Sequence, residues 1–179
     1  MSNMNSEEDS NMNVPNKDKE LEENIINNKY NNYIIAEINI EKYKKKKNKK
    51  NKKNNINKKI ILINSFEQTI KEKGQDYFED IKKEEYYKYE NEKEIKDNCL
   101  IEIINNKIEF SYFHEFKEEG KYIIKYIFLN NITKTDFMFY NCESLTNLNL
   151  SNFNTQNVIN MSSMFYYCNS LLNNIYKIK

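Results

Sequence analysis

Apolar residues follow two different patterns along this chain, and each pattern predicts its own kind of element. Short apolar runs, some of them alternating with polar residues, predict strands, and they lie at residues 30–40, 60–63, 99–104, 107–112 and 121–128. The pair Asn105-Asn106 between two of these runs predicts a hairpin turn. A helix is predicted after Ser65, because Gln68 has capping-box spacing and Gly74 ends a short apolar face. Residues 75–98 show no firm period and predict loop or weak helix.

The last third of the chain matches itself at a fixed offset. Residues 138–145, Met-Phe-Tyr-Asn-Cys-Glu-Ser-Leu, return 26 residues later as residues 164–171, Met-Phe-Tyr-Tyr-Cys-Asn-Ser-Leu. Such a match indicates a stacked structural repeat. Within one unit, Leu148 and Leu150 alternate with polar residues as in a short strand. Residues between positions 158 and 168 place apolar side chains three to four apart, as on one stripe of a helix.

A strand–turn–helix unit cannot cover its own apolar face, so it must stack on a neighbour. We therefore predict an α+β protein in which a small β-rich leader domain precedes a short solenoid of 26-residue units. The predicted parts are a disordered polar tail (1–28), the leader (29–120) with a Lys/Asn-rich insertion (42–59), and the repeats (121–179). The predicted repeat core consists of Leu145, Leu148, Leu150, Phe153, Val158, Met161, Met164, Phe165, Cys168 and Leu171.

The run of residues 145–158, followed by 160–165, resembles the BspA-like leucine-rich repeats, which are 26-residue repeats also found in mycoplasma lipoproteins and in microbial eukaryotes. The resemblance implies a leucine-rich-repeat solenoid with a role in adhesion, recognition or protein–protein contact, and it supplies no catalytic residues. After Leu171 the pattern slips, because the next apolar residues are Ile175 and Ile178. About two repeats without a C-terminal cap are thus predicted. Either the chain is a truncated family copy with no independent function, or its open end pairs with a partner or with itself.

Composition adds a second functional hypothesis. The net charge is +1 and Lys is abundant, while roughly one residue in five is Asn, a bias typical of AT-rich coding sequence. The lysines of residues 44–53 are a candidate polyanion-binding arm or nuclear-import signal. Nucleic acid is the less favoured ligand, because the tract has neither Arg for bidentate contacts nor interleaved aromatic residues for base stacking. A flexible insertion without function is the alternative.

The location predicted from sequence is cytoplasmic, with the nucleus as an alternative through the Lys tract. The first residues, Met-Ser-Asn-Met-Asn-Ser-Glu-Glu-Asp, lack the apolar stretch of a secretory signal. The apolar runs are also far shorter than the roughly 20 residues that a membrane span requires.

Candidate chemistry is sparse, so we predict no enzyme activity, no cofactor, no metal and no small-molecule substrate. The chain has three cysteines, one histidine (His114) and two glycines, too few for a zinc site or a phosphate-binding loop. Cys142 and Cys168 occupy equivalent repeat positions, where free buried thiols are predicted and a disulfide is the alternative. The predicted function is binding of an unknown protein partner by the exposed row of the repeat strands: Lys121, Ile123, Lys125, Asn147, Asn149 and Ser151.

Overall fold

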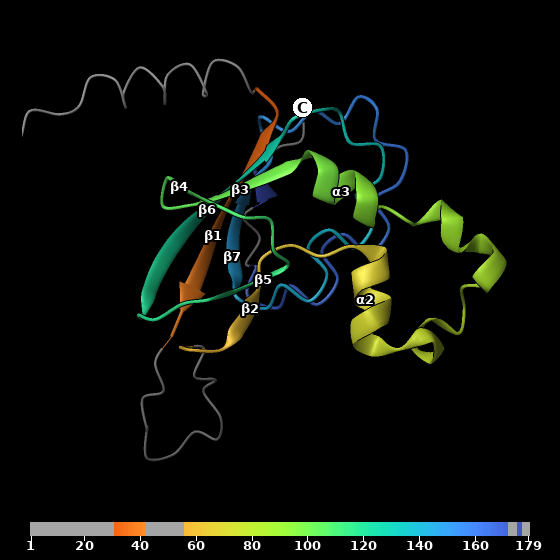
Figure 1. Ribbon diagram of the computed structural model, residues 1–179, viewed down its shortest axis with the longest axis horizontal. Coiled ribbons are helices and arrows are strands. Elements are labelled where there is room, and N and C mark those ends of the chain that lie inside the picture. Colours follow the sequence, from red (N-terminus) through yellow and green to blue (C-terminus); the bar gives the residue numbers. More distant parts are fainter. Residues whose placement is uncertain (1–30, 42–55, 172–174, 177–179) are drawn as a thin grey trace, which may run out of the picture.

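The computed structural model describes residues 31–41, 56–171 and 175–176, and within these residues two layers pack together (Figure 1). One layer is a sheet of six strands in the order β4-β3-β6-β1-β7-β8. The other contains two short α-helices, two 3₁₀ helices and a two-stranded sheet of β2 and β5. The strands are β1 (Tyr33–Ile40), β2 (Lys59–Ile61), β3 (Cys99–Ile103), β4 (Asn106–Ile108), β5 (Phe113–Glu115), β6 (Gly120–Phe128), β7 (Leu145–Asn149) and β8 (Ile175–Tyr176). The helices are α2 (Phe66–Lys73), η1 (Gln75–Phe78), η2 (Lys83–Lys88) and α3 (Glu92–Asn98).

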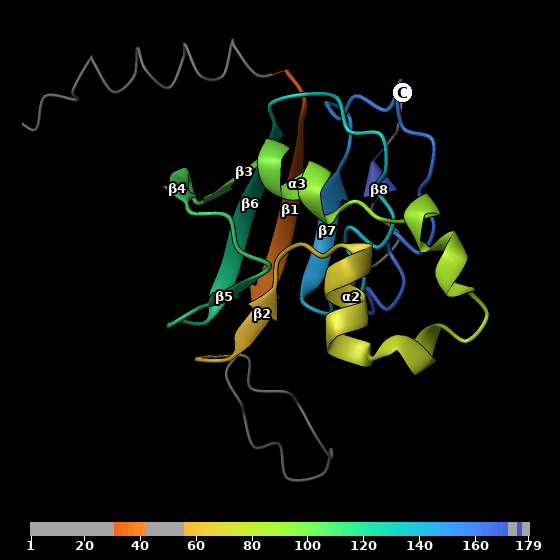
Figure 2. The ribbon, with the colours of Figure 1, turned by 45° about the vertical axis from the view of Figure 1, so that its right-hand side comes forward.

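Strand β1 lies in the middle of the large sheet. It pairs antiparallel with β6 on one side, with Ile35 opposite Lys125, and antiparallel with β7 on the other, with Ile35 opposite Asn149. The five strands from β4 to β7 are antiparallel, and only the short β8 is parallel to its neighbour among the described strands. Figure 2 shows β1 between β6 and β7, with α2 and α3 in front of the sheet. The sheet is therefore assembled from segments that are far apart in the sequence.

The core lies on one face of this sheet. Alternate β1 residues, from Ile34 to Ile40, are buried, as expected for a strand with one face on a core. Residues of β3, β6 and β7 add to the same cluster, and Met138 and Phe139 cover it from the C-terminal region. A smaller aromatic cluster of Phe66, Phe78, Phe137 and Tyr140 lies beside it.

Local sequence signals account for α2. The Ser65 hydroxyl accepts a hydrogen bond from the Gln68 backbone N–H at 3.1 Å, and Gly74 ends the helix with a φ of 86°. Both termini confirm the prediction from the capping spacing and the glycine. The strand at Tyr33–Ile40, the hairpin of β3 and β4, and β6 also confirm predicted elements, although β4 is shorter than its apolar run.

The predicted fold class is wrong, because the C-terminal region forms no solenoid separate from a leader domain. Strands β6 and β7, which the repeat pattern predicts to be neighbours, are separated by β1 and belong to one antiparallel sheet. The helix predicted within residues 158–168 is absent from the described chain, as is any helix at the equivalent residues 132–142, and successive turns take their place. These turns are closed by bonds from residue i+3 to residue i, such as Met138 N–H to Thr135 O at 3.2 Å. Each turn spans residues i to i+3, close to the length of one helical turn, so an apolar spacing of three to four residues does not distinguish the two.

The predicted domain boundaries fall at the start of a strand or outside the described residues. The boundary between residues 120 and 121 coincides with the start of β6. The tail (1–28) and most of the Lys/Asn-rich insertion (42–59) lie outside the described residues. Among the residues that are described, no helix has the length and apolar character that crossing a bilayer requires.

Candidate functional site

Five of the six predicted contact residues lie on the face of the sheet opposite the core. Lys121, Ile123 and Lys125 alternate along β6, and Asn147 and Asn149 alternate along β7. They are not adjacent, because β1 lies between them and places Glu37 opposite both Ile123 and Asn147. The sixth residue, Ser151, is exposed beyond the end of β7.

Much of this predicted face is occupied by contacts within the chain. The Lys121 ammonium lies 3.0 Å from a Glu37 carboxylate oxygen, and the Lys125 ammonium lies 4.7 Å from the centre of the Tyr33 ring. The Asn149 side chain accepts hydrogen bonds from the backbone and the hydroxyl of Ser151. These polar groups are already engaged, which makes the sheet face a weaker candidate than the pattern indicated.

A second candidate lies in two segments that share one backbone conformation. We name residues 131–145 the first turn segment and residues 157–171 the second turn segment. Phe137 and Asn141 adopt left-handed φ values of 57° and 59°, and their equivalents 26 residues later, Ser163 and Tyr167, adopt 55° and 61°. The turn closed by Tyr140 N–H at 2.9 Å is likewise repeated 26 residues later at 3.2 Å. The 26-residue repeat is therefore real as local structure, although it builds turns.

The two turn segments are joined side by side through their backbones. Four N–H groups of the first segment donate to four carbonyl oxygens of the second at 2.8–3.0 Å. The donor–acceptor pairs are Thr135–Asn160, Phe137–Ser162, Phe139–Met164 and Asn141–Tyr166. One bond runs in the opposite direction, from the Ile159 N–H to Thr133 O at 2.8 Å. From residue 135 onward, donors and acceptors occur at every second residue, so that part of each segment donates on one edge and accepts on the other.

Aromatic side chains stack across the same junction. The rings of Phe139 and Phe165 are nearly parallel, at 7°, with their centres 6.0 Å apart. Those of Tyr140 and Tyr166 are tilted by 19° with centres 5.8 Å apart. Each pair is separated by 26 residues, so the sequence repeat places like side chains one above the other.

The accepting edge of the first turn segment is closed by two buried asparagines. The Asn91 amide donates to Asp136 O at 2.7 Å and to Lys134 O at 3.4 Å. Asn64 donates its backbone N–H to Met138 O at 2.6 Å and its side-chain amide to Tyr140 O at 3.3 Å. These four carbonyls are the 26-residue equivalents of those at 160, 162, 164 and 166. Asn64 and Asn91 thus supply the donors that a preceding turn segment would otherwise provide.

The donating edge of the second turn segment has no such cover among the described residues. The N–H groups equivalent to the four donors above belong to Met161, Ser163, Phe165 and Tyr167, and no described residue accepts from them. Met161, Ser163 and Tyr167 are exposed, and Phe165 is half-buried. An unpaired row of backbone donors is a recognised template for pairing with another chain.

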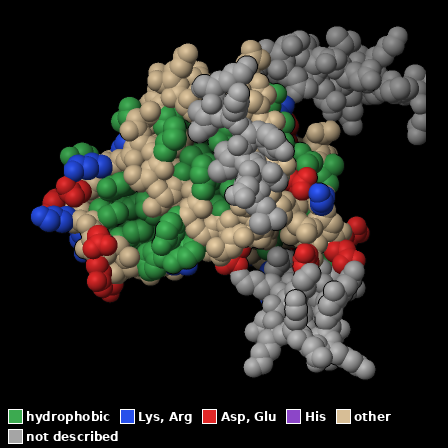
Figure 3. All heavy atoms as spheres, turned by 180° about the vertical axis from the view of Figure 1, so that it is seen from behind, with side chains coloured by type: hydrophobic (Ala, Val, Ile, Leu, Met, Phe, Trp, Pro, Cys, Tyr) green, Lys and Arg blue, Asp and Glu red, His purple; other side chains and the backbone are tan. Residues whose placement is uncertain are grey.

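Large apolar side chains surround this edge. Ile159 is 79% exposed, the most of any large hydrophobic residue in the described chain, and Met161, Tyr166 and Tyr167 are exposed as well. Figure 3 shows hydrophobic side chains gathered on the face of the molecule that lies behind the view of Figure 1. The centres of the Tyr166 and Tyr167 rings lie 4.4 Å apart, and both rings lie next to the ring of Tyr140, with centres 5.8 and 5.9 Å from it.

The exposure of Met161 contradicts its predicted place in the repeat core. Met161 is exposed because the described chain places no further segment against it, whereas its equivalent in the first turn segment, Thr135, is buried. Of the other predicted core residues, five are buried: Leu145, Leu148, Leu150, Phe153 and Met164. The remaining four are half-buried: Val158, Phe165, Cys168 and Leu171.

One ionisable group links the two turn segments. A carboxylate oxygen of Asp136 accepts from the Ser162 backbone N–H at 3.1 Å, and the other oxygen is buried with no hydrogen-bond partner in the described part of the chain. Burial raises the pKa of Asp136 to about 6, against a usual value of 3.8. The carboxylate therefore destabilises this junction most when it is charged.

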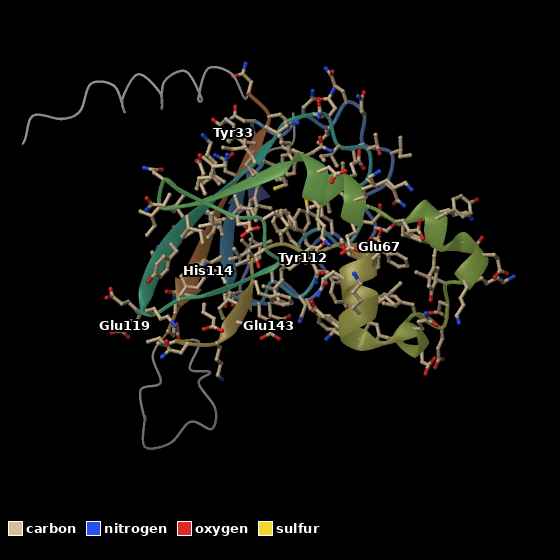
Figure 4. All side chains as sticks on the ribbon, viewed as in Figure 1. Tyr33, Glu67, Tyr112, His114, Glu119 and Glu143 are labelled. Carbon is tan, nitrogen blue, oxygen red and sulfur yellow. The ribbon has the colours of Figure 1, made fainter. Side chains whose placement is uncertain are left out.

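The cysteines and the histidine of the described residues lie apart from the junction of the turn segments or belong to it as buried or half-buried free thiols. Cys99 and Cys142 are buried and Cys168 is half-buried, all three as free thiols, as predicted. His114 lies on β5 (Figure 4), and the centre of its ring lies 4.7 Å from the centre of the Phe116 ring. Over the described residues, no group of three His, Cys, Asp or Glu side chains is placed to bind a metal.

A shallow acidic depression beside α3 is also accounted for by structural contacts. It is lined by Glu67, Glu90, Asn91, Lys93, Glu94 and Asp97. Glu67 accepts from the backbone N–H groups of Asn91 and Glu92, and so caps the start of α3. Glu94 accepts from the backbone N–H of Thr133 at 2.7 Å. The carboxylates that reach across the depression therefore hold α3 against its neighbours.

Comparison with known proteins gives one match. Residues 103–179 match the sequence model of a family described as "Mycoplasma protein of unknown function, DUF285". The matched region includes β6, β7 and both turn segments, but it is less than half of the chain. It gives a weak link to that family and leaves the leucine-rich-repeat type open. No match was found among curated proteins or among solved structures.

Sequence reasoning missed Asn64 and Asn91. In a chain where roughly one residue in five is Asn, neither residue is conspicuous. A local signal exists only for Asn91, which is the N-cap of α3, a position that favours Asn; Asn64 precedes the N-cap Ser65 of α2 and carries no such signal. Which carbonyls they reach depends on contacts 43–76 residues away.

Proposed function

We propose that this protein is a non-enzymatic protein-binding module and that its contact surface is the exposed side of the second turn segment. The observation that carries the proposal is the group of large apolar side chains at that surface: Ile159, Met161, Tyr166 and Tyr167. Contiguous exposed apolar groups in a folded domain are typical of interaction sites. Tyrosines are enriched at such sites because they bury a large ring and keep a polar hydroxyl.

The sheet face predicted from sequence gives less support for this function. Its charged residues are paired with Glu37 or lie over Tyr33, so a partner would have to displace contacts that the chain already makes. At the second turn segment the large apolar side chains are exposed, so a partner would displace fewer contacts within the chain. The resemblance to BspA-like repeats, which implies recognition, points the same way. The Lys-tract hypothesis concerns residues outside the described chain and receives no support from these contacts.

Site-specific photo-cross-linking tests the proposal directly. We place p-benzoylphenylalanine at Tyr166 of the full chain and, as a matched control, at Ile104, which lies in the β3–β4 turn and has the same 54% exposure. In extract of the source cell, irradiation is expected to give discrete adducts from position 166 and none from position 104. Ile159→Lys should reduce the yield from position 166 at least tenfold, because it places a charge among apolar side chains.

Two results would contradict the proposal. Equal adduct patterns from both positions would show nonspecific labelling, and an unchanged yield in the Ile159→Lys variant would show that the apolar surface is not used. Circular dichroism of the variant must match that of the unmodified chain, so that loss of binding is not loss of fold.

A further inference from the structure

One carboxylate reaches across the junction of the two turn segments. Asp136 is completely buried, and its Oδ1 accepts a hydrogen bond from the Ser162 backbone N–H at 3.1 Å. Its Oδ2 is also buried and has no hydrogen-bond partner in the described part of the chain. The backbone of the residue is held from the other side, because the Asp136 carbonyl accepts from the Asn91 amide at 2.7 Å. The fold therefore fixes a carboxyl group at the junction and leaves one of its oxygens unpaired.

The second turn segment carries its own acceptor for the N–H group that Asp136 binds. The Ser162 N–H lies 3.2 Å from the side-chain oxygen of Asn160, and the Ser162 hydroxyl donates to the same oxygen at 2.8 Å. If the segments separate at this point, Ser162 keeps a hydrogen bond and the Asp136 carboxylate gains water. A charged group that is buried with an unpaired oxygen favours such a separation, because solvation of the charge is regained.

The charged groups around Asp136 do not neutralise it. Lys134, on the same segment, attracts the carboxylate, but its ammonium donates to a carbonyl of η2 at 2.6 Å. On η2 itself, Lys88 is paired with a glutamate at 2.7 Å. From α2 and α3 the contacts near this point are carboxylates, since Glu67 and Glu94 accept from the backbone N–H groups of residues 91 and 134. The second turn segment contains no Asp, Glu, Lys, Arg or His.

We propose that Asp136 makes the seating of the second turn segment on the first sensitive to pH: the neutral acid holds the two segments together, and the carboxylate loosens them. A proton on Oδ2 removes the buried charge and leaves Oδ1 able to accept from Ser162. The fold thus contains a conformational switch at the one place where a carboxylate of the first segment bonds to the second among the described contacts.

The direction and size of the response follow from proton linkage. Burial raises the pKa of Asp136 in the seated state to about 6, whereas in an opened segment it returns to the usual 3.8. Between these values the seated state binds more protons, so opening becomes easier as pH rises through that window. The equilibrium constant for opening should therefore increase about tenfold between pH 5 and pH 7.5.

The switch regulates the contact surface, and in this respect the inference rests on the proposed function. Ile159 and Met161, two of the exposed apolar residues of that surface, lie on either side of Asn160 and next to Ser162. Ile159 is held to the first segment by its N–H bond to Thr133 O at 2.8 Å. A partner should therefore meet a more firmly ordered surface in mildly acidic solution than at neutral pH.

Amide hydrogen exchange of the ¹⁵N-labelled full chain tests the switch. The reporters are N–H groups that bond across the junction, those of Thr135, Phe137, Phe139 and Ile159. Exchange is measured at pH 5.0 and 7.5 in low concentrations of urea, and each rate is corrected for the intrinsic effect of pH. We expect the reporters to exchange through a local opening that depends less on urea than exchange in β1 does. Its equilibrium constant should be about tenfold larger at pH 7.5.

Three variants assign the effect to one group. Asp136→Asn and Asp136→Ser both remove the charge, and Ser is the residue at the equivalent position 162. Either variant should give the same opening constant at the two pH values. Glu143→Gln, which removes the other carboxylate of the first turn segment, should keep the tenfold change. Reporters that share the urea dependence of β1 would overturn the inference, because the segments would then part only on global unfolding. A pH effect that persists in both Asp136 variants would overturn it as well.

The two proposals can fail separately. A pH-dependent opening that disappears in the Asp136 variants, without any cross-linked partner at Tyr166, would support the switch and refute the proposed function. Cross-linking from Tyr166 that depends on Ile159, with an opening constant that is equal at both pH values, would support the proposed function and refute the switch.

Discussion

Removing the Asn91 side chain is the sharpest single test of the closed edge. In the Asn91→Ala variant, Asp136 O loses its donor at 2.7 Å and the Phe66 N–H loses its acceptor at 3.1 Å. Both backbone groups lie in buried residues. A buried polar group left without a partner costs about 1–3 kcal/mol, so for two such groups we expect the free energy of unfolding to fall by about 2–6 kcal/mol. That is a large part of the roughly 5–15 kcal/mol of a typical domain.

The assay is urea unfolding of the full chain followed by tyrosine fluorescence and circular dichroism, since the sequence has no Trp. Asn157→Ala is the matched control, because Asn157 is exposed and its side chain has no hydrogen bond in the described chain; its effect should stay within about 0.5 kcal/mol. Asn91→Asp separates the two roles of the amide. It keeps the acceptor for Phe66 but turns a negative oxygen toward two carbonyls, so it should be at least as destabilising at neutral pH.

An Asn91→Ala variant within 1 kcal/mol of the unmodified chain, with an unchanged dependence on urea, would refute the reasoning. It would mean that water or a shifted backbone satisfies the carbonyls, and that the edge is not closed by this side chain. Loss of stability in Asn91→Ala but none in Asn91→Asp would assign the effect to the Phe66 contact alone.

Two further predictions concern ionisable groups. Because the folded-state pKa of Asp136 is raised to about 6 from 3.8, the folded state binds more protons between these values, and the group's contribution to stability falls as pH rises through that window. Asp136→Asn should therefore be more stable than the unmodified chain at pH 7.5, by about 1–2 kcal/mol, with the difference vanishing near pH 4; a pH-independent difference would contradict this. Burial raises the pKa of Cys99 and Cys142, and that of Cys168 to about 11. At pH 8 a thiol reagent such as DTNB should label Cys168 slowly and the other two only after unfolding; rapid labelling of all three would refute their burial.

Elements with local signals were predictable from the sequence. The Ser65–Gln68 spacing and Gly74 bound α2, and alternating or continuous apolar runs located β1, β3, β6 and β7. The 26-residue match has a structural counterpart in the stacked rings of Phe139 and Phe165, although the solenoid predicted from it is wrong. Even the slip after Leu171 has a structural counterpart, because β8 pairs Ile175 with Leu148, an offset of 27.

The sequence could not predict how those elements combine. A stripe with three- to four-residue spacing fits both a helix and a series of i+3 turns, and the left-handed residues that decide between them, such as Phe137 and Tyr167, are not residue types that usually adopt that conformation. The position of β1 depends on pairing with residues 80–114 positions away in the sequence, for which no periodicity exists. The candidate site could not be predicted for the same reason. Its edges are distinguished by which carbonyls Asn64 and Asn91 reach, and these contacts span 76 and 45 residues.

The central place of β1 has a consequence for biosynthesis. Its two neighbours are β6 and β7, so a nascent chain that has already exposed Ile34 and Ile38 must wait until residues 120–149 leave the ribosome before the sheet can close. Such non-local pairing folds slowly, and until it is complete β1 is an apolar strand with both edges free. Synthesis that stops between β6 and β7 would leave one of those edges open permanently. Such products should depend on chaperones or be degraded, whereas chains that extend past Asn149 can bury the strand.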